Sequence, residues 1–120
     1  MSGITVYRIQ DRSGRGPWKP GFSRAWLEDR PEEEFAALRA IQEAAPHIAH
    51  SEPKGHRGCG CRTLAQLRRW FTPTEYARLL DWDYCCVQME VDRVLYSDEV
   101  QVLFERKKPL RKDVRVVTLY

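Results

Sequence analysis

No run of apolar residues in this sequence approaches the roughly 18 that a membrane-spanning helix requires. The N-terminus also lacks the apolar stretch that forms the centre of a secretory signal peptide. We therefore expect no membrane partner and a cytoplasmic location.

The cysteines lack the usual spacing of zinc ligands. The chain has three histidines and four cysteines, and the cysteines occur as Cys59-x-Cys61 and as the adjacent Cys85-Cys86. Zinc sites usually use cysteines with two or more residues between them, and a single intervening residue gives poor chelate geometry. We expect no bound metal. Without a secretory signal, free thiols are favoured over disulfides, and the role of the cysteines stays open.

Signatures of several functional classes are absent as well. The glycines at positions 14 and 16 lack P-loop spacing. No helix-turn-helix or RNP pattern is present, and a Cys–His nucleophile pair would lack a recognisable third group. No catalytic set is complete, so the sequence leaves open whether the chain is an enzyme.

Charge is unevenly distributed although the net charge is only +3. Residues 54–70 contain five Lys or Arg and no acid, residues 106–115 contain six against one Asp, and residues 28–34 contain five acids and one Arg. Segregated charge suggests a partner with a patterned surface. The basic residues that could contact nucleic-acid phosphates are Arg62, Arg68, Arg69, Arg106, Lys107 and Lys108.

A chain of 120 residues with 42% apolar residues is expected to form a single domain, residues 1–120. Two capping boxes, Thr63 with Gln66 and Thr72 with Glu75, predict two helix starts. Hydrophobic periodicity predicts a strand at residues 4–9, helices at 31–45, 64–71 and 73–80, and strands at 84–91, 100–105 and 114–119, with residues 47–62 as a loop.

The predicted fold class is α+β, with an N-terminal strand, three helices, and then three mostly antiparallel strands that form one small curved sheet. One hydrophobic core is expected. Its predicted members are Val6, Phe35, Leu38, Leu67, Trp70, Val87, Met89, Val102 and Phe104.

Arg8 and the Gly-Arg-Gly-Pro-Trp loop at residues 14–18 form the candidate binding site. A guanidinium on a central strand needs a negatively charged partner. Glu90, Glu99 and Glu105 are its candidate internal partners. Alternatively, Arg8, Arg15 and Trp18 surround a cleft that accepts an acidic side chain of a partner or a nucleotide phosphate.

Four short motifs resemble a family of small uncharacterised phage and prophage proteins. These motifs are Val-Tyr-Arg-Ile at residues 6–9, Gly-Arg-Gly-Pro-Trp at 14–18, Gly-Cys-Arg-Thr-Leu-x-Gln-Leu-Arg-Arg-Trp-Phe at 60–71, and Gln-Val-x-Phe at 101–104. The resemblance implies a mobile-element context and a host-cell location.

The chain also resembles, more weakly, the ADP-ribosyltransferase fold. That fold has an Arg on its first strand, a Ser/Thr motif in mid-chain and a catalytic Glu on a late strand. Arg8, Thr63 and Gln101 occupy comparable places. Because Gln101 stands where the catalytic Glu should be, the resemblance implies a degenerate or atypical enzyme that uses NAD; no other cofactor is expected.

Three functional hypotheses follow. The leading one is a phage accessory protein that binds and inhibits a host protein system, in counter-defence or host takeover. The second is the NAD-using enzyme, and the third is a nucleic-acid-binding protein.

Overall fold

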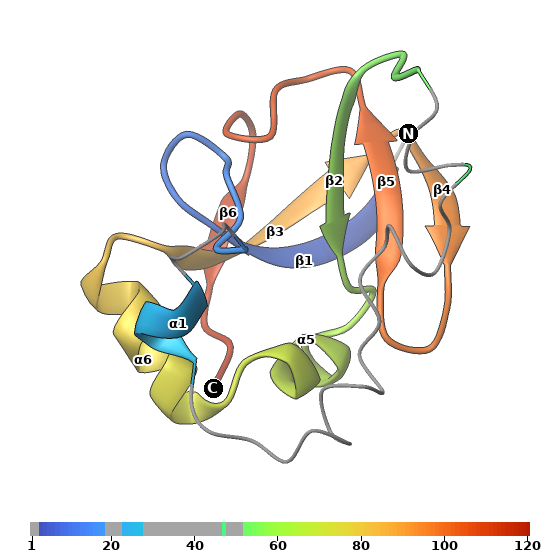
Figure 1. The fold of residues 1–120 in the computed structure, drawn as a ribbon. Coiled ribbons are helices and arrows are strands. Elements are labelled where there is room, and N and C mark those ends of the chain that lie inside the picture. The colour runs from blue at the N-terminus through green and yellow to red at the C-terminus, as the bar shows by residue number, and fades with distance from the viewer. Residues whose placement is uncertain (1–2, 19–22, 28–46, 48–51) are drawn as a thin grey trace.

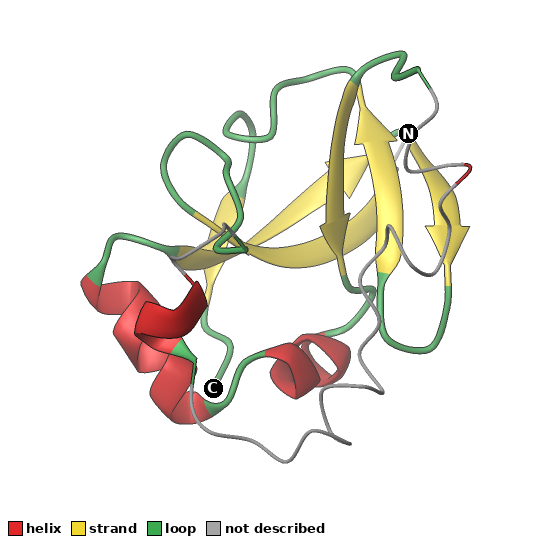
Figure 2. Cartoon of the chain, in the orientation of Figure 1, coloured by secondary structure: helices red, strands yellow, loops and turns green. Residues whose placement is uncertain are grey.

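The computed structural model describes residues 3–18, 23–27, 47 and 52–120 (Figures 1 and 2). Its described elements form an α+β fold, as the sequence predicts. None of the described helices is long and apolar enough to cross a membrane. In chain order the elements are β1 (Ile4–Gln10), α1 (Ser23–Trp26), β2 (His56–Gly60), α5 (Leu64–Trp70), α6 (Pro73–Asp81), β3 (Cys85–Val91), β4 (Arg93–Ser97), β5 (Val102–Arg106) and β6 (Arg115–Val117).

The first sheet, sheet A, has the strand order β1-β3-β6, and both pairings are antiparallel. Val6 lies opposite Met89, and Ile9 lies opposite Cys86. Alternate residues of a strand point to opposite faces of a sheet. The Val6–Met89 pair therefore lies on one face and the Ile9–Cys86 pair on the other, so sheet A has apolar residues on both faces.

The second sheet, sheet B, has the strand order β2-β5-β4 and is also antiparallel. Its strands run across the direction of β1 (Figure 1). A single residue, Asp92, separates β3 from β4, so the chain passes directly from sheet A into sheet B. At a second junction, the main-chain N–H and C=O groups of Tyr7 and Cys61 exchange two hydrogen bonds of 2.8 Å. These two links fix one sheet against the other.

The two predicted capping boxes are present. Thr63 Oγ1 accepts the Gln66 N–H at 3.1 Å, and Gln66 Oε1 accepts the Thr63 N–H at 3.3 Å. The same reciprocal bonds, 3.2 and 2.9 Å long, connect Thr72 with Glu75 at the start of α6. These contacts are local in sequence and satisfy first-turn N–H groups. For that reason the two helix starts are where the sequence predicts them.

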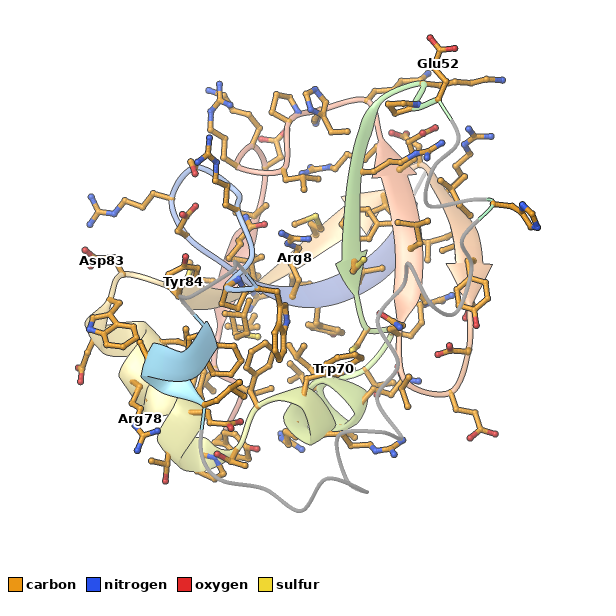
Figure 3. The ribbon with its side chains drawn as sticks, viewed as in Figure 1. Arg8, Glu52, Trp70, Arg78, Asp83 and Tyr84 are labelled. Atoms are coloured by element: carbon orange, nitrogen blue, oxygen red, sulfur yellow. The ribbon has the colours of Figure 1, made fainter. Side chains whose placement is uncertain are left out.

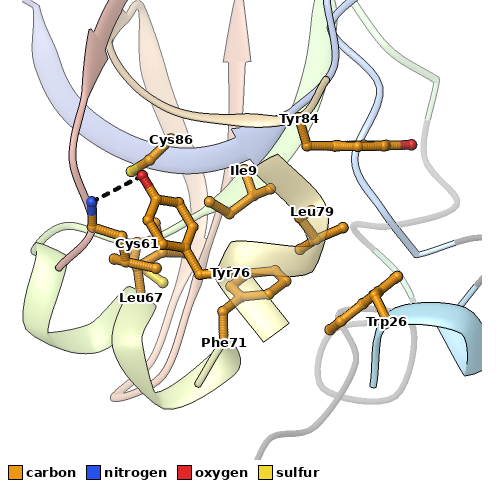
Figure 4. Packing of buried hydrophobic residues seen from close by; sticks show 10 residues of the cluster. Ile9, Trp26, Cys61, Leu67, Phe71, Tyr76, Leu79, Tyr84 and Cys86 are labelled. Atoms are coloured by element: carbon orange, nitrogen blue, oxygen red, sulfur yellow. Dashed lines mark hydrogen bonds between the residues drawn. The ribbon is translucent and has the colours of Figure 1, made fainter. Parts of the chain in front are cut away.

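One hydrophobic core, the helix-side core, lies between sheet A and the helices (Figure 4). The Tyr76 hydroxyl accepts a hydrogen bond from the Leu119 N–H at 3.3 Å, which fastens the C-terminal segment to α6. The buried members of this core are Ile9, Trp26, Cys61, Leu67, Phe71, Tyr76, Leu79, Tyr84, Cys86 and Leu119.

A separate inter-sheet core fills the space between the two sheets. Its buried members are Val6, Val87, Met89, Val91, Val102 and Phe104. The prediction of one core was therefore wrong, because sheet A buries both faces. Leu67 belongs to the helix-side core and Trp70 is half-buried against it, whereas Phe35 and Leu38 lie outside the described residues.

The prediction of a single curved sheet was also wrong, because two of the described strands were not predicted. β2 forms inside the stretch expected to be a loop, and β4 follows β3 without a turn-rich connection. Other strand ends differ by one or two residues, as is common for element boundaries. The predicted helices at 64–71 and 73–80 correspond to α5 and α6, and the predicted helix at 31–45 lies outside the described residues.

Candidate functional site

Arg8 is buried on β1, with 7% of its surface exposed. Its Nη1 donates to the Cys59 carbonyl on β2 at 3.0 Å, and its Nη2 donates to the Gly14 carbonyl at 3.1 Å. In Figure 3 the side chain lies between the loop after β1 and strand β2. A Cβ at position 58 would lie 2.5 Å from Arg8 Nη1, so Gly58 leaves the room that the guanidinium occupies.

The sequence-derived carboxylate partners of Arg8 are not its partners in the structure. Glu90 accepts a bond from the Gly3 N–H, and Glu105 pairs with two other arginines. Among the described residues, Arg8 makes no ion pair; two backbone carbonyls accept its hydrogen bonds instead. Burial lowers the pKa of Arg8, although Cys59 and Asp11 act in the opposite direction.

The loop after β1 is built by local hydrogen bonds. Asp11 Oδ1 accepts from the Ser13 N–H at 2.9 Å and from the Arg15 N–H at 3.0 Å, and Gly14 has a left-handed φ of 89°. Glycine adopts this conformation without a steric penalty. The turn directs the Gly14 carbonyl toward Arg8 and leaves Arg15 exposed.

Trp18 belongs to a group of four aromatic residues that we call the aromatic surface. Its ring centroid lies 4.8 Å from that of Trp26, 6.0 Å from that of Trp70 and 5.9 Å from that of Phe71. Trp26 and Phe71 are buried, whereas 46% of Trp18 is exposed. Two hydrogen bonds fix the supporting indoles: Trp26 Nε1 to the Pro17 carbonyl at 3.2 Å, and Trp70 Nε1 to the Val100 carbonyl at 2.8 Å.

The predicted cleft of Arg8, Arg15 and Trp18 is therefore divided. Arg15 and Trp18 are exposed, whereas Arg8 is buried beneath the same loop and bonded to it. The sequence did not identify the three aromatic residues behind Trp18, because they come from distant segments. The one signal in the sequence that could have indicated this group is that Trp26, Trp70 and Phe71 are all aromatic.

Thr63 and Gln101 both make structural hydrogen bonds. The Thr63 hydroxyl caps α5, and Gln66 of the same capping box donates to the Glu99 carbonyl at 3.1 Å. Gln101 is buried, and its N–H donates to Asp98 Oδ1 at 2.9 Å. These contacts hold the segment that leads into β5 against the start of α5.

The candidate phosphate-binding residues divide into two groups. Arg68 Nε donates to the Leu119 carbonyl at 2.7 Å and its guanidinium lies over the Tyr120 ring. Arg106 is buried and donates to the Lys112 carbonyl at 2.8 Å and to the Pro109 carbonyl at 3.2 Å. The exposed residues are Arg62, Arg68, Arg69, Lys107 and Lys108, and Lys108 pairs with Asp113.

The cysteines are free thiols among the described residues. Burial raises the pKa of Cys61 and of Cys86 to about 12, which keeps both thiols protonated at neutral pH. Burial also raises the pKa of Cys59, against the opposing charge of Arg8. No group of three or more His, Cys, Asp or Glu residues in the described part of the chain could hold a metal ion.

A cross-strand ladder on sheet B was not identified from the sequence. Glu105 on β5 lies opposite Arg57 on β2 and opposite Arg93 on β4. Its carboxylate accepts from Arg57 at 3.0 Å, from Arg93 at 2.7 Å and from the Lys54 N–H at 3.0 Å. Hydrogen bonds from Arg93, the Lys54 N–H and Arg57 lower the pKa of Glu105 to about 2.

Acid is expected to weaken the fold through Glu105. A carboxyl group whose pKa is lower in the folded state stabilises the fold above its unfolded pKa, and this contribution is lost as the pH falls toward the folded value. The melting temperature of the wild type should therefore fall between about pH 4.5 and about pH 2, and more steeply than that of Glu105→Gln. Thermal melts across this range, with Glu99→Gln as an exposed control, test the ladder; equal slopes for wild type and Glu105→Gln would contradict it.

Comparison with known proteins identifies a family. Residues 1–116 match the family model described as Bacteriophage T4 Y00F protein. No curated protein and no solved structure matches the chain. Because the match covers nearly the whole sequence, the chain belongs to the Bacteriophage T4 Y00F protein family.

Proposed function

We propose that this chain is a phage accessory protein that binds a host protein through the aromatic surface around Trp18 and thereby inhibits it. Membership of a phage protein family supports an accessory role. The observation that carries the binding proposal is the exposure of Trp18. This residue is 46% exposed, although its ring packs against three other aromatic rings.

The aromatic surface suits a protein partner for a physical reason. Tryptophan and arginine are enriched among the residues that dominate the energy of protein interfaces. An aromatic side chain already held by its neighbours loses little conformational entropy on binding. Arg15 is exposed in the same loop and can donate two hydrogen bonds to a carboxylate. The surface therefore fits a partner with an apolar pocket that is bordered by acidic residues.

The described contacts give less support to the NAD-using enzyme. Arg8 binds two backbone carbonyls, Thr63 caps α5, and Gln101 cannot supply the negative charge of a catalytic glutamate. Nucleic-acid binding also receives less support, because Arg106 is buried and bound to backbone carbonyls, and the exposed Arg68 donates its Nε–H to the Leu119 carbonyl. The proposed binding role needs no cofactor and places the protein in the host cytoplasm.

Capture from host lysate, with and without nuclease, tests this proposal. The tagged wild-type protein is expected to retain one host protein whose recovery nuclease does not change, and Trp18→Ala should lose it. Trp82→Ala is the matched control, because Trp82 is 43% exposed at the end of α6 and lies outside the aromatic surface. Circular dichroism checks that both variants fold.

The outcomes separate the hypotheses. Loss of the host protein on nuclease treatment would favour nucleic-acid binding and contradict the proposal. Equal recovery by Trp18→Ala and by wild type would exclude the aromatic surface as the contact. The activity of the recovered host protein is then measured in the presence of each variant. The wild type should inhibit this activity, and Trp18→Ala should not.

A further inference from the structure

A buried hydrogen-bond donor and a buried acceptor occur two residues apart on β1. Arg8 Nε and Gln10 Oε1 are the two buried side-chain polar atoms that make no hydrogen bond within the described part of the chain. Gln10 is 1% exposed, and Arg8 is 7% exposed. Residues two apart on a strand point to the same face, so both side chains leave β1 on the side of the inter-sheet core.

The terminal groups of these two side chains donate to backbone carbonyls that lie close to each other. Arg8 Nη2 donates to the Gly14 carbonyl, and Gln10 Nε2 donates to the Leu110 carbonyl at 2.9 Å. A Cβ at Gly14 would lie 3.1 Å from Leu110 Cβ, so these two anchors are in contact. A Cβ at Gly58 would lie 2.5 Å from Arg8 Nη1 and 3.0 Å from Leu110 Cδ1. The guanidinium and the carboxamide therefore converge beside Leu110.

The Leu110 carbonyl fixes the orientation of the Gln10 amide. A carbonyl oxygen only accepts hydrogen bonds, so the amide nitrogen must face it and Oε1 must face away. The unpartnered Arg8 Nε–H can only donate. The two side chains thus leave one donor and one acceptor unpaired on the same buried face of β1, and leaving either unpaired in a buried site is unfavourable.

These requirements define the chemistry of the ligand. The ligand must accept a hydrogen bond from Arg8 Nε and donate one to Gln10 Oε1. A fully ionised oxyanion has no proton to donate, and the oxygen of Gln10 would repel it. Water meets both requirements, and internal waters typically bind polar groups that lack a protein partner.

We propose that one internal water molecule bridges Arg8 Nε and Gln10 Oε1. It accepts from the guanidinium and donates to the amide oxygen, and its second hydrogen is available to a carbonyl oxygen. The water completes a polar network that connects β1 with the loop at Gly14, with β2 at Cys59 and with the turn at Leu110. Arg8 is thereby a positioning residue that holds these segments together.

A high-resolution crystal structure of the wild-type protein tests the bridge directly. One ordered water is expected within about 2.7–3.2 Å of both Arg8 Nε and Gln10 Oε1. A direct hydrogen bond between these two atoms, an oxyanion in the site, or the absence of solvent density between them would each overturn the proposal.

Magnetic relaxation dispersion of the water signal in solution supplies a second readout. Gln10→Met removes the amide oxygen at similar side-chain length, and the residence time of the bound water should fall by roughly tenfold, which corresponds to the loss of one hydrogen bond. Gln88→Met makes the same change on β3 outside the bridge and should leave the residence time unchanged. An unchanged residence time in Gln10→Met would overturn the bridge; if that variant does not fold, the wild-type crystal structure decides.

Discussion

Replacement of Phe104 by alanine is expected to lower the free energy of unfolding by about 3–5 kcal/mol. Phe104 is fully buried in the inter-sheet core and lies opposite Gly58 on β2 and Val94 on β4. A Cβ at Gly58 would lie 2.8 Å from the end of its ring, so the ring fills the space above that glycine. Truncation would leave a cavity between two sheets that are fixed at both junctions.

Denaturant unfolding of Phe104→Ala, followed by circular dichroism, measures this loss. In a thermal melt, the melting temperature of Phe104→Ala should be lower than that of the wild type by on the order of 10 °C or more. Leu80→Ala on α6 is the control, because Leu80 is exposed and an exposed truncation usually changes stability by less than about 0.5 kcal/mol. Similar melting temperatures for Phe104→Ala and wild type would show that the inter-sheet core does not hold the sheets together.

Replacement of Arg8 by alanine is expected to lower the free energy of unfolding by about 2–4 kcal/mol. The substitution leaves the Cys59 and Gly14 carbonyls without their donor and opens a cavity under the loop. Relief from burying an unpaired charge offsets part of this loss. Arg8→Lys should also destabilise the protein, because one ammonium group cannot reproduce the planar fork of a guanidinium.

Arg12→Ala provides the matched control for Arg8. Arg12 is exposed in the same loop, so its removal should change the melting temperature little. Folded Arg8→Ala protein should still capture the host protein at low temperature. A variant with wild-type stability that no longer captured the partner would instead identify Arg8 as a contact residue.

The features that the sequence predicted correctly are those encoded by nearby residues. Each capping box joins residues three apart, and the apolar periodicity of α6 lies within nine residues. The α+β class follows from such local patterns. The capping residues needed no information about the rest of the chain.

The features that the sequence did not predict depend on distant contacts. Glycine-rich β2 has the composition of a loop, but its glycines are required by neighbours. A Cβ at Gly58 would meet Arg8, and a Cβ at Gly60 would lie 2.7 Å from the Tyr7 carbonyl oxygen. Because β2 was not predicted, Arg57 could not be placed opposite Glu105, and the ladder on sheet B was missed.

The candidate site shows the same division. The sequence grouped Arg8, Arg15 and Trp18 into one cleft because they are close together in the chain. It could not indicate that Trp26 and Phe71 contact Trp18, or that the Gly14 carbonyl accepts a hydrogen bond from Arg8. The aromatic contacts arise only when the helices pack against sheet A, and the Arg8 bond arises only when the loop folds back over β1.

The affinity of purified host protein for the Trp18 variant tests the central claim most directly. Isothermal titration of the captured partner is expected to show that Trp18→Ala weakens binding by about 30-fold or more, the loss typical of a dominant interface residue. Trp82→Ala should remain within about threefold of the wild type. A Trp18→Ala affinity within threefold of the wild type would contradict the claim that the aromatic surface binds the partner.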